Sequence, residues 1–292
     1  MSEPVNYWDS VAAHSRIDEI WASHPLVRSY INASVSGDPD VWPTTWLKSR
    51  LAAQTPLERT LSIGCGMGQF ERDLVRLDIV GHVLGVEVSP VCVAEATRLA
   101  AESGQGHRID YVCADAREEL ERCRDLDAIL FHASLHHFDR LEALARQLRR
   151  ALKPGGYLYF DEYVGPSPAE WSLLDELRWN WHYYHLPKSV RRVGRIRPPI
   201  NFDDPTEAVE SSGILPAVER EFEIVERRDY GGNLLAVIYG NLRRPTENPP
   251  SPRADFDAAV AQLIAAEKEL LRRGGVSARP FHSVVLARSR RS

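Results

Sequence analysis

The feature that most constrains this chain is a short β-prone run followed at once by three closely spaced glycines. Residues 60–63 form the run, and Gly64, Gly66 and Gly68 follow it. Glycine has no Cβ, so such a loop lets the backbone approach a ligand closely. Residues 69–77 then place apolar side chains at helical spacing, which predicts a helix whose first amides point back at that ligand.

A second apolar run and an acid complete this unit. Residues 83–88 are β-prone and carry Glu87 near their carboxyl end. An acid about 20 residues beyond a glycine loop accepts hydrogen bonds from ribose hydroxyls. The order predicts a nucleotide-binding βαβ unit. The loop GCGMG is G-x-G-x-G, one residue shorter than the dinucleotide fingerprint, which disfavours a nicotinamide oxidoreductase without excluding it. A glycine-rich turn without a ligand is the structural alternative.

Composition narrows the class of protein. The chain has 292 residues, is 43% hydrophobic and has a net charge of -5. These values predict one α/β domain with extensions and disfavour nucleic acid as a partner. No apolar run reaches the ~20 residues that span a bilayer, and the amino terminus lacks a signal-like core, so we expect a cytoplasmic protein without a membrane partner. The four cysteines show no zinc-ligand spacing, so we expect reduced thiols and no metal.

Five segments in a fixed order carry a resemblance to a known family. They are LSIGCGMG, GVEVSP, VCADA, DAILFHASLHHF and LKPGGYLYFDEYVG, within residues 61–165. Together they resemble the class I S-adenosylmethionine-dependent methyltransferases. The resemblance implies a Rossmann-like, seven-stranded, mostly parallel sheet with helices on both faces and an antiparallel last strand. It also implies S-adenosyl-L-methionine as the cofactor and S-adenosyl-L-homocysteine as its product.

The resemblance also implies a set of cofactor-binding residues at the carboxyl ends of the strands. Asp115 would take the adenine amino group, and Ala116 would offer a backbone amide to the ring. One departure concerns Ser62, because the family usually has an acid there that helps to hold the methionine end of the cofactor. The predicted cofactor-binding residues are Gly64, Cys65, Gly66, Gly68, Glu87, Val88, Asp115, Ala116 and His132.

Catalytic candidates follow the fourth and fifth predicted strands. A histidine can act as a base near neutral pH, and His137 in the loop 132–138 is our first candidate. Asp161 and Glu162 come next, at the end of a strand that the turn KPGG is expected to precede. His182 is the last candidate. The structural alternatives are that the loop histidines pack or cap a helix, and that the acids form a solvated turn.

The predicted organisation has three parts. Residues 1–55 form a helical lid, residues 56–292 form the methyltransferase domain, and residues 166–215 are a substrate-side insertion within it. In the lid, the candidates to close the site are Tyr7, Trp8 and His24. Packing against the sheet is the alternative, and it is the one we expect for Trp21. In the insertion, Trp181 and Tyr184 could form an aromatic wall, and the basic run 188–197 could bind a carboxylate or phosphate.

The remaining elements are predicted from periodicity and end signals. Ser89-Pro90 starts a helix, and a short helix is expected after residues 203–205. The predicted strands are 108–113, 128–131, 157–161, 222–230 and 281–287, and the other helices are 141–152, 233–242 and 256–273.

We therefore expect methyl transfer from S-adenosylmethionine to a small molecule, at a hydroxyl oxygen. Nitrogen and carbon acceptors stay open, as do RNA or protein methylation and a cofactor-binding protein that does not transfer methyl groups. Ser62, which replaces the acid that the family usually has, would be an early sign of a protein that binds the cofactor without transferring methyl groups. Composition and spacing do not decide the oligomeric state, and a homodimer is one option.

Overall fold

The computed structural model describes residues 20–201, 203–204, 206–274 and 279–290. One seven-stranded sheet has the order β3-β2-β1-β4-β5-β7-β6. Neighbours pair in parallel except at β7, which is antiparallel to both β5 and β6. The predicted fold class is therefore confirmed. The strands are β1 (Thr60–Ile63), β2 (Val83–Glu87), β3 (Ile109–Cys113), β4 (Leu126–His132), β5 (Leu152–Tyr163), β6 (Phe222–Asp229) and β7 (His282–Ser289).

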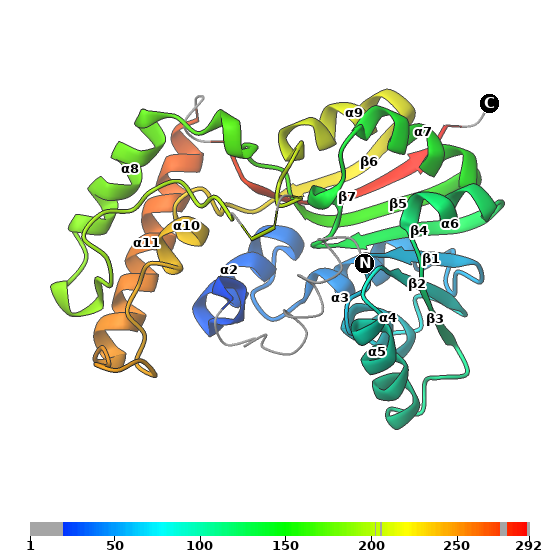
Figure 1. Ribbon diagram of the computed structural model, residues 1–292, viewed down its shortest axis with the longest axis horizontal. Coiled ribbons are helices and arrows are strands. Elements are labelled where there is room, and N and C mark those ends of the chain that lie inside the picture. The colour runs from blue at the N-terminus through cyan, green and yellow to red at the C-terminus, as the bar shows by residue number, and fades with distance from the viewer. Residues whose placement is uncertain (1–19, 202, 205, 275–278, 291–292) are drawn as a thin grey trace.

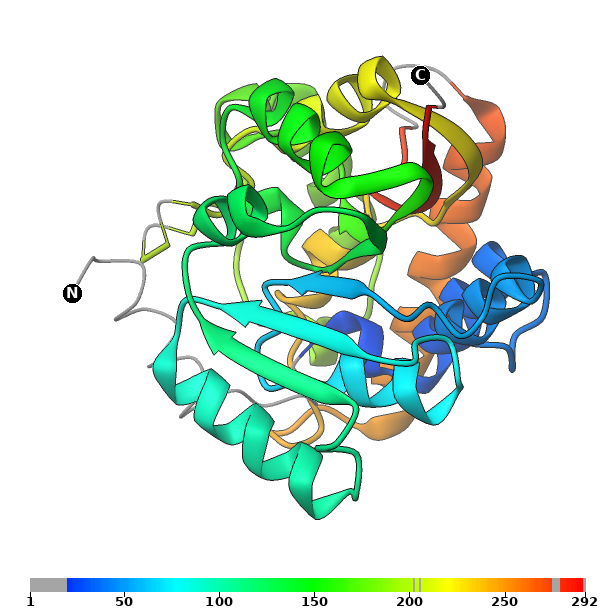
Figure 2. The ribbon, with the colours of Figure 1, turned by 90° about the vertical axis from the view of Figure 1, so that its right-hand side faces the viewer.

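Helices cover both faces of this sheet (Figures 1 and 2). Short 3-10 segments are η2 (Trp21–Ser23), η3 (Leu135–His137), η4 (Pro168–Glu170), η5 (Lys188–Val190) and η6 (Ser211–Gly213). The α-helices are α2 (Pro25–Ser36), α3 (Pro43–Leu51), α4 (Gln69–Arg76), α5 (Pro90–Glu102), α6 (Ala116–Arg122), α7 (Leu141–Ala151), α8 (Leu173–Tyr184), α9 (Ile214–Glu221), α10 (Leu235–Tyr239) and α11 (Arg253–Arg273).

Side chains of the central strands point alternately to the two faces of the sheet, so the core consists of two apolar clusters, one on each face. On β4, Leu130 packs with side chains of α2, α3, α4, α8, α10 and α11, while Ile129 and Phe131 pack with α6, α7 and α9. Successive side chains of a strand point to opposite faces, so a strand buried on both faces is apolar throughout. This two-sided burial leaves the carboxyl edge of the parallel strands as the place where polar loops gather.

The predicted division of the chain into lid, domain and insertion stays a prediction, but its described parts can be placed. Helices α2 and α3 contribute Val27 and Trp46 to the core, and Trp21 packs on Tyr230 with ring centroids 6.5 Å apart. Helix α8 lies beside α10, which contacts α11, at the left of Figure 1. Within these described ranges no helix is long and apolar enough to cross a membrane.

Two local predictions are wrong. The KPGG segment lies inside β5 and not before it: β4 and β5 pair at Leu126–Leu152 and again at Ala128–Tyr157, so the segment bulges out between these pairs. The short helix expected after residues 203–205 is a turn, and helical residues begin only at η6. Asp204 stabilises this turn, since its Oδ1 accepts from the backbone N–H of Thr206 at 2.9 Å and from its hydroxyl at 2.6 Å.

Candidate functional site

The glycine loop joins β1 to α4. Gly64, Gly66 and Gly68 have φ angles of 67°, 51° and 74°, a conformation that favours glycine. A Cβ on Gly66 would meet no atom within 4 Å, so this glycine faces open space. A Cβ on Gly68 would lie 2.1 Å from the hydroxyl of Tyr111. Gly68 is therefore needed to begin α4 and to make room for Tyr111. The sequence predicted a different role for Gly68, a contact with a cofactor.

Glu87 is bound to the loop through its carboxylate. Its Oε2 accepts from the backbone N–H of Gly66 at 3.0 Å, and its Oε1 accepts from those of Val88 and Ser89 at 2.8 and 3.0 Å. Asp115, at the end of β3, likewise accepts through Oδ1 from the first amides of α6, at 2.8 and 3.1 Å. Backbone donors thus hold both carboxylates at the edge of the sheet.

A cavity of about 550 Å³, here called the glycine-loop cavity, opens at this edge. Its walls come from the ends of β1, β2, β3 and β4, which are distant in sequence and adjacent in the sheet. Among the predicted cofactor-binding residues, only Gly68 does not line it. Those that do are Gly64, Cys65, Gly66, Glu87, Val88, Asp115, Ala116 and His132. The first catalytic candidate, His137, lines the same cavity.

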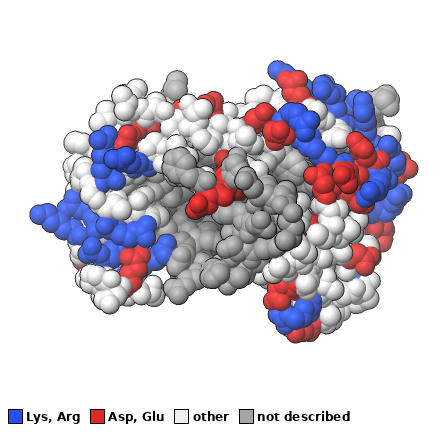
Figure 3. Space-filling view, viewed as in Figure 1, with Lys and Arg blue, Asp and Glu red and all other residues white. Residues whose placement is uncertain are grey.

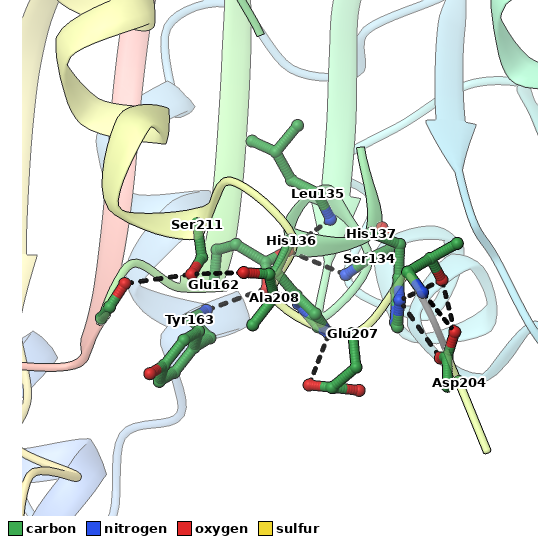
Figure 4. Close-up of polar contacts among 12 residues, drawn as sticks. Ser134, Leu135, His136, His137, Glu162, Tyr163, Asp204, Glu207, Ala208 and Ser211 are labelled. Carbon is green, nitrogen blue, oxygen red and sulfur yellow. Dashed lines mark hydrogen bonds and ion pairs between the residues drawn. The ribbon is translucent and has the colours of Figure 1, made fainter. Parts of the chain in front are cut away.

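Glu162 is the centre of a hydrogen-bond network that holds the loop after β4 (Figure 4). Its Oε2 accepts from the backbone amides of Ser134 and Leu135 at 2.8 and 2.6 Å, and its Oε1 accepts from the Tyr163 amide at 2.9 Å and pairs with His136 Nδ1. Glu162 is 1% exposed and lines none of the three cavities described here. This position suits a structural acid, in contrast to the base predicted from sequence.

His136 lies between two carboxylates. Beyond its pair with Glu162, its Nε2 is 3.7 Å from Glu207 Oε1. Burial alone would lower the pKa of His136, but the charges of Glu162 and Glu207 and the hydrogen bond to Glu162 raise it to about 9. The same pair keeps the pKa of Glu162 below its usual range in spite of burial. His136 is therefore a cation at neutral pH.

His137 has the opposite character. Burial is the main cause that lowers the pKa of His137. The positive charge of His136 lowers it further, because the centroids of the two rings are 4.1 Å apart. Its Nδ1 lies 3.1 Å from the hydroxyl of Thr206, which donates to Asp204 and so must accept here. Nδ1 therefore carries the proton and Nε2 the lone pair. Asp204 Oδ2 lies 3.5 Å from Nδ1 and is buried without a hydrogen bond.

A second cavity, of about 250 Å³, lies on the other side of this histidine pair. We call it the apolar cavity, since Tyr163, Trp171 and Phe281 line it. Two pairs of sequence neighbours separate it from the glycine-loop cavity: His136 and Glu207 face the apolar side, while His137 and Thr206 face the glycine loop. The histidine loop thus forms a shared wall.

A third cavity, of about 300 Å³, adjoins the glycine-loop cavity, with Gly64, Cys65 and His132 lining both. We call it the Arg28 cavity, because α2 contributes Arg28 to its wall. Asp161, another catalytic candidate, also lines it. Burial raises the pKa of Asp161, and its Oδ1 accepts from the hydroxyl of Tyr230 at 2.5 Å.

The other predicted residues lie elsewhere. His182 on α8 lines none of the three cavities, and Trp181 and Tyr184 are 65% and 49% exposed, so they form no aromatic wall of these cavities. The basic run faces solvent in the region of α8 (Figure 3), where Arg195 pairs with Glu176 at 2.8 Å. His24 caps α2 and contacts Asp257. Tyr7 and Trp8 lie outside the described residues.

One cluster of potential metal ligands occurs in the described part of the chain. His136, His137 and Glu207 each place one ligand atom within 4.8 Å of the others. His136 lies between Glu162 and Glu207, and a metal would have to displace the proton that these two carboxylates favour on its ring. The ion pairs of His136 explain why these ligand atoms lie close together, and the absence of a metal stays a prediction.

Comparison with known proteins identifies the domain around the glycine-loop cavity. Residues 61–160 match the model of a family described as a methyltransferase domain. Residues 61–160 form a class I methyltransferase domain. Members of this family use S-adenosylmethionine as their methyl donor, as the resemblance implied. The matched segment contains β2, β3 and β4, most of β1 and β5, and all the residues of the glycine-loop cavity except Thr206.

Individual relatives are distant. The 27-O-demethylrifamycin SV methyltransferase of Amycolatopsis mediterranei is 33% identical over 132 residues, 43% of this chain and 47% of that protein. Sterol 24-C-methyltransferase erg6 of Aspergillus fumigatus is 24% identical over 58% of this chain and 52% of its own length. The chain thus spans about half the length of these relatives. The crystal structure of the cyclase SpnF shares the fold, with a TM-score of 0.50, 21% identity and coverage of 92% and 94%.

Several residues around these cavities were not found from the sequence. Asp204 and Thr206 come from outside the matched segment and reach His137 only through the fold. Arg28 belongs to a helix predicted as a lid, and Glu71 lies on the buried side of α4. A glutamate on an apolar helix face is the one signal that could have found Glu71, because such a residue is rarely buried without a function or a partner.

Proposed function

We propose that this protein transfers a methyl group from S-adenosylmethionine to a hydroxyl oxygen of a small apolar molecule. The observation that carries the proposal is the glycine-loop cavity, which combines a glycine facing open space with two acids held at the ends of β2 and β3. At about 550 Å³ it has the size of a nucleoside-binding site. Glu87 would accept from the ribose hydroxyls, and Asp115 and Ala116 would meet the adenine.

The bound cofactor would supply an electrophilic methyl group, so the protein has to position an acceptor and remove its proton. Our proposed acceptor site is the part of the glycine-loop cavity that His137 and Phe138 line, because the methyl group passes directly from cofactor to acceptor and the base has to reach the acceptor hydroxyl. The apolar cavity lies behind the histidine pair and has no lining residue in common with the glycine-loop cavity. Relatives differ in the atom that their names specify, oxygen in one and carbon in the other. The hydroxyl is favoured by a base at the shared wall.

His137 is the proposed base. It is neutral at pH 7, and its tautomer leaves the lone pair on Nε2. When Nε2 takes a proton, the charge on the imidazole is balanced by Asp204, whose Oδ2 lies 3.5 Å from Nδ1. This is the arrangement of an oriented general base, in which a carboxylate fixes the tautomer and stabilises the cation. His136, already protonated, keeps the loop in place.

The test is formation of S-adenosylhomocysteine with a panel of small apolar alcohols and phenols. We expect wild-type turnover with some of them, and a loss of about a hundredfold or more for His137→Ala, the usual contribution of a general base. Affinity for S-adenosylhomocysteine should hold. His182→Ala is the matched control, because this histidine lies on α8 away from the cavities.

Other outcomes would favour the alternatives. Binding of S-adenosylmethionine without methylation of any acceptor would indicate a cofactor-binding protein, and methylation of RNA or protein alone would refute the small-molecule proposal. Unchanged turnover of His137→Ala across the pH range would show that His137 is not the base.

A further inference from the structure

The acid that the family usually places before the glycine loop is absent from β1, but an acid lies beside the same position. Ser62 is 1% exposed, and its hydroxyl donates to Oε1 of Glu71, in the first turn of α4. The strand residue and the helix residue are nine positions apart and meet across the loop. A carboxylate therefore reaches the place where the chain has only a hydroxyl.

The second carboxylate oxygen of Glu71 is not satisfied. Glu71 is fully buried, and its Oε2 has no hydrogen-bond partner. A buried acceptor without a donor costs about 1 to 3 kcal/mol, so proteins seldom keep one without a use. Glu71 lines the Arg28 cavity. Burial raises the pKa of Glu71 to about 7, against the lowering effect of the hydrogen bond from Ser62. A cationic donor in the cavity would remove this penalty.

The opposite charge is available in the same cavity. Arg28 lies over the ring of Trp42, 4.4 Å from its centroid, and both line the Arg28 cavity. Burial lowers the pKa of Arg28, while the charge of Asp161 acts in the other direction. A small cavity that presents a guanidinium and an unsatisfied carboxylate is complementary to a zwitterion. The guanidinium can pair with the carboxylate of the ligand, and the carboxylate can accept from its ammonium group.

We propose that the Arg28 cavity binds the amino-acid end of the cofactor, with Glu71 Oε2 accepting from the ammonium and Arg28 facing the carboxylate. The acid missing from position 62 is then supplied by α4 instead of β1. The cavity adjoins the glycine-loop cavity at Gly64, Cys65 and His132, so one ligand can extend through both. This inference rests on the proposed function and assigns two residues that sequence reasoning did not consider.

The test compares two ligands that differ in the amino-acid part. S-adenosylhomocysteine has the ammonium and carboxylate, whereas 5′-methylthioadenosine lacks both and keeps the adenosine and the thioether. Calorimetric titration should show that Glu71→Gln weakens S-adenosylhomocysteine about ten- to a hundredfold, the effect of losing a hydrogen bond to a charged group. Binding of 5′-methylthioadenosine should change less than about threefold, since its atoms do not reach Glu71.

Control variants distinguish the loss of the proposed contacts from a general effect of charge and from misfolding. Glu95→Gln removes an acid of α5 that pairs with Arg98 at 2.6 Å and lines none of the three cavities, so it should leave both affinities within about twofold. Ser62→Asp combined with Glu71→Ser returns the acid to β1 and should restore at least part of the affinity. Arg28→Met should weaken only S-adenosylhomocysteine, and it provides the test should Glu71→Gln fail to fold.

Three results would overturn the inference. They are equal losses for the two ligands, no loss for S-adenosylhomocysteine in Glu71→Gln, and an unchanged affinity in Arg28→Met. A wild-type protein that binds neither ligand would instead contradict the proposed function.

Discussion

Raising the pH from 6.5 to 8.5 should destabilise this protein, chiefly through His136. The folded-state pKa of His136 is about 9, because Glu162 and Glu207 more than offset the effect of burial. In the unfolded chain the pKa returns to about 6.5. A raised pKa means that the stabilisation is fully present below pH 6.5 and is lost as the pH rises through 9.

The magnitude follows from this shift. Between the two pKa values the free energy of unfolding falls by about 1.4 kcal/mol per pH unit, so the change from pH 6.5 to 8.5 is about 2 to 3 kcal/mol. Glu71 adds a smaller loss of about 1 kcal/mol, because burial raises its pKa to about 7 and its proton leaves at the lower end of this window. His137 and His282 have lowered pKa values and act below pH 6.5, and the raised pKa of Cys65 acts only where an unfolded thiol would ionise, above about pH 8.5.

Urea unfolding at several pH values measures this slope, and His136→Gln is the matched variant. Its unfolding free energy should be lower at pH 6.5 and should fall across the window only by the contribution of Glu71, about 1 kcal/mol. A wild-type slope near zero, or the same slope in the variant, would refute the assignment of a buried histidinium between Glu162 and Glu207.

Three further predictions concern the loops and the proposed base. Gly68→Ala should cost about 2 to 4 kcal/mol in urea unfolding, because its Cβ would overlap the hydroxyl of Tyr111, whereas Gly66→Ala should cost about 1 kcal/mol and chiefly weaken S-adenosylhomocysteine in calorimetry. Equal stability losses would contradict this difference. His137→Ala should lower kcat more than it raises KM, measured as S-adenosylhomocysteine formation. Turnover should be unchanged after dialysis against a chelator, because the sulfonium of the cofactor makes the methyl group electrophilic without a metal; loss of turnover that zinc or magnesium restores would contradict this.

The sheet was predictable because its signals are local. An apolar run, glycines and an acid define β1, the loop and β2 within one stretch of chain, and Ser89-Pro90 starts α5 as expected, with the serine side chain accepting from Cys92 N–H at 3.1 Å. Eight predicted cofactor-binding residues line one cavity, because they follow parallel strands whose carboxyl ends meet at one edge of the sheet.

The polar network was not predictable, because its members meet only in the folded chain. Glu162 and Asp161 are neighbours in sequence, but alternation along β5 places one under the histidine loop and the other in the Arg28 cavity. His182 was misplaced for a related reason: α8 turns Trp179 and Tyr183 into the core, so the histidine beside them is directed elsewhere. Which face of a helix is buried depends on its neighbours.

The most direct test of the central claim is calorimetric titration of S-adenosylmethionine into the wild type and Glu87→Gln, with NAD as a control ligand. We predict binding in the micromolar range to the wild type, a loss of about tenfold or more in the variant, and no binding of NAD. Glu87→Gln keeps the size of the side chain, so its thermal unfolding should confirm that the fold is retained. A wild type that binds NAD, or neither ligand, would contradict the assignment of the glycine-loop cavity to S-adenosylmethionine.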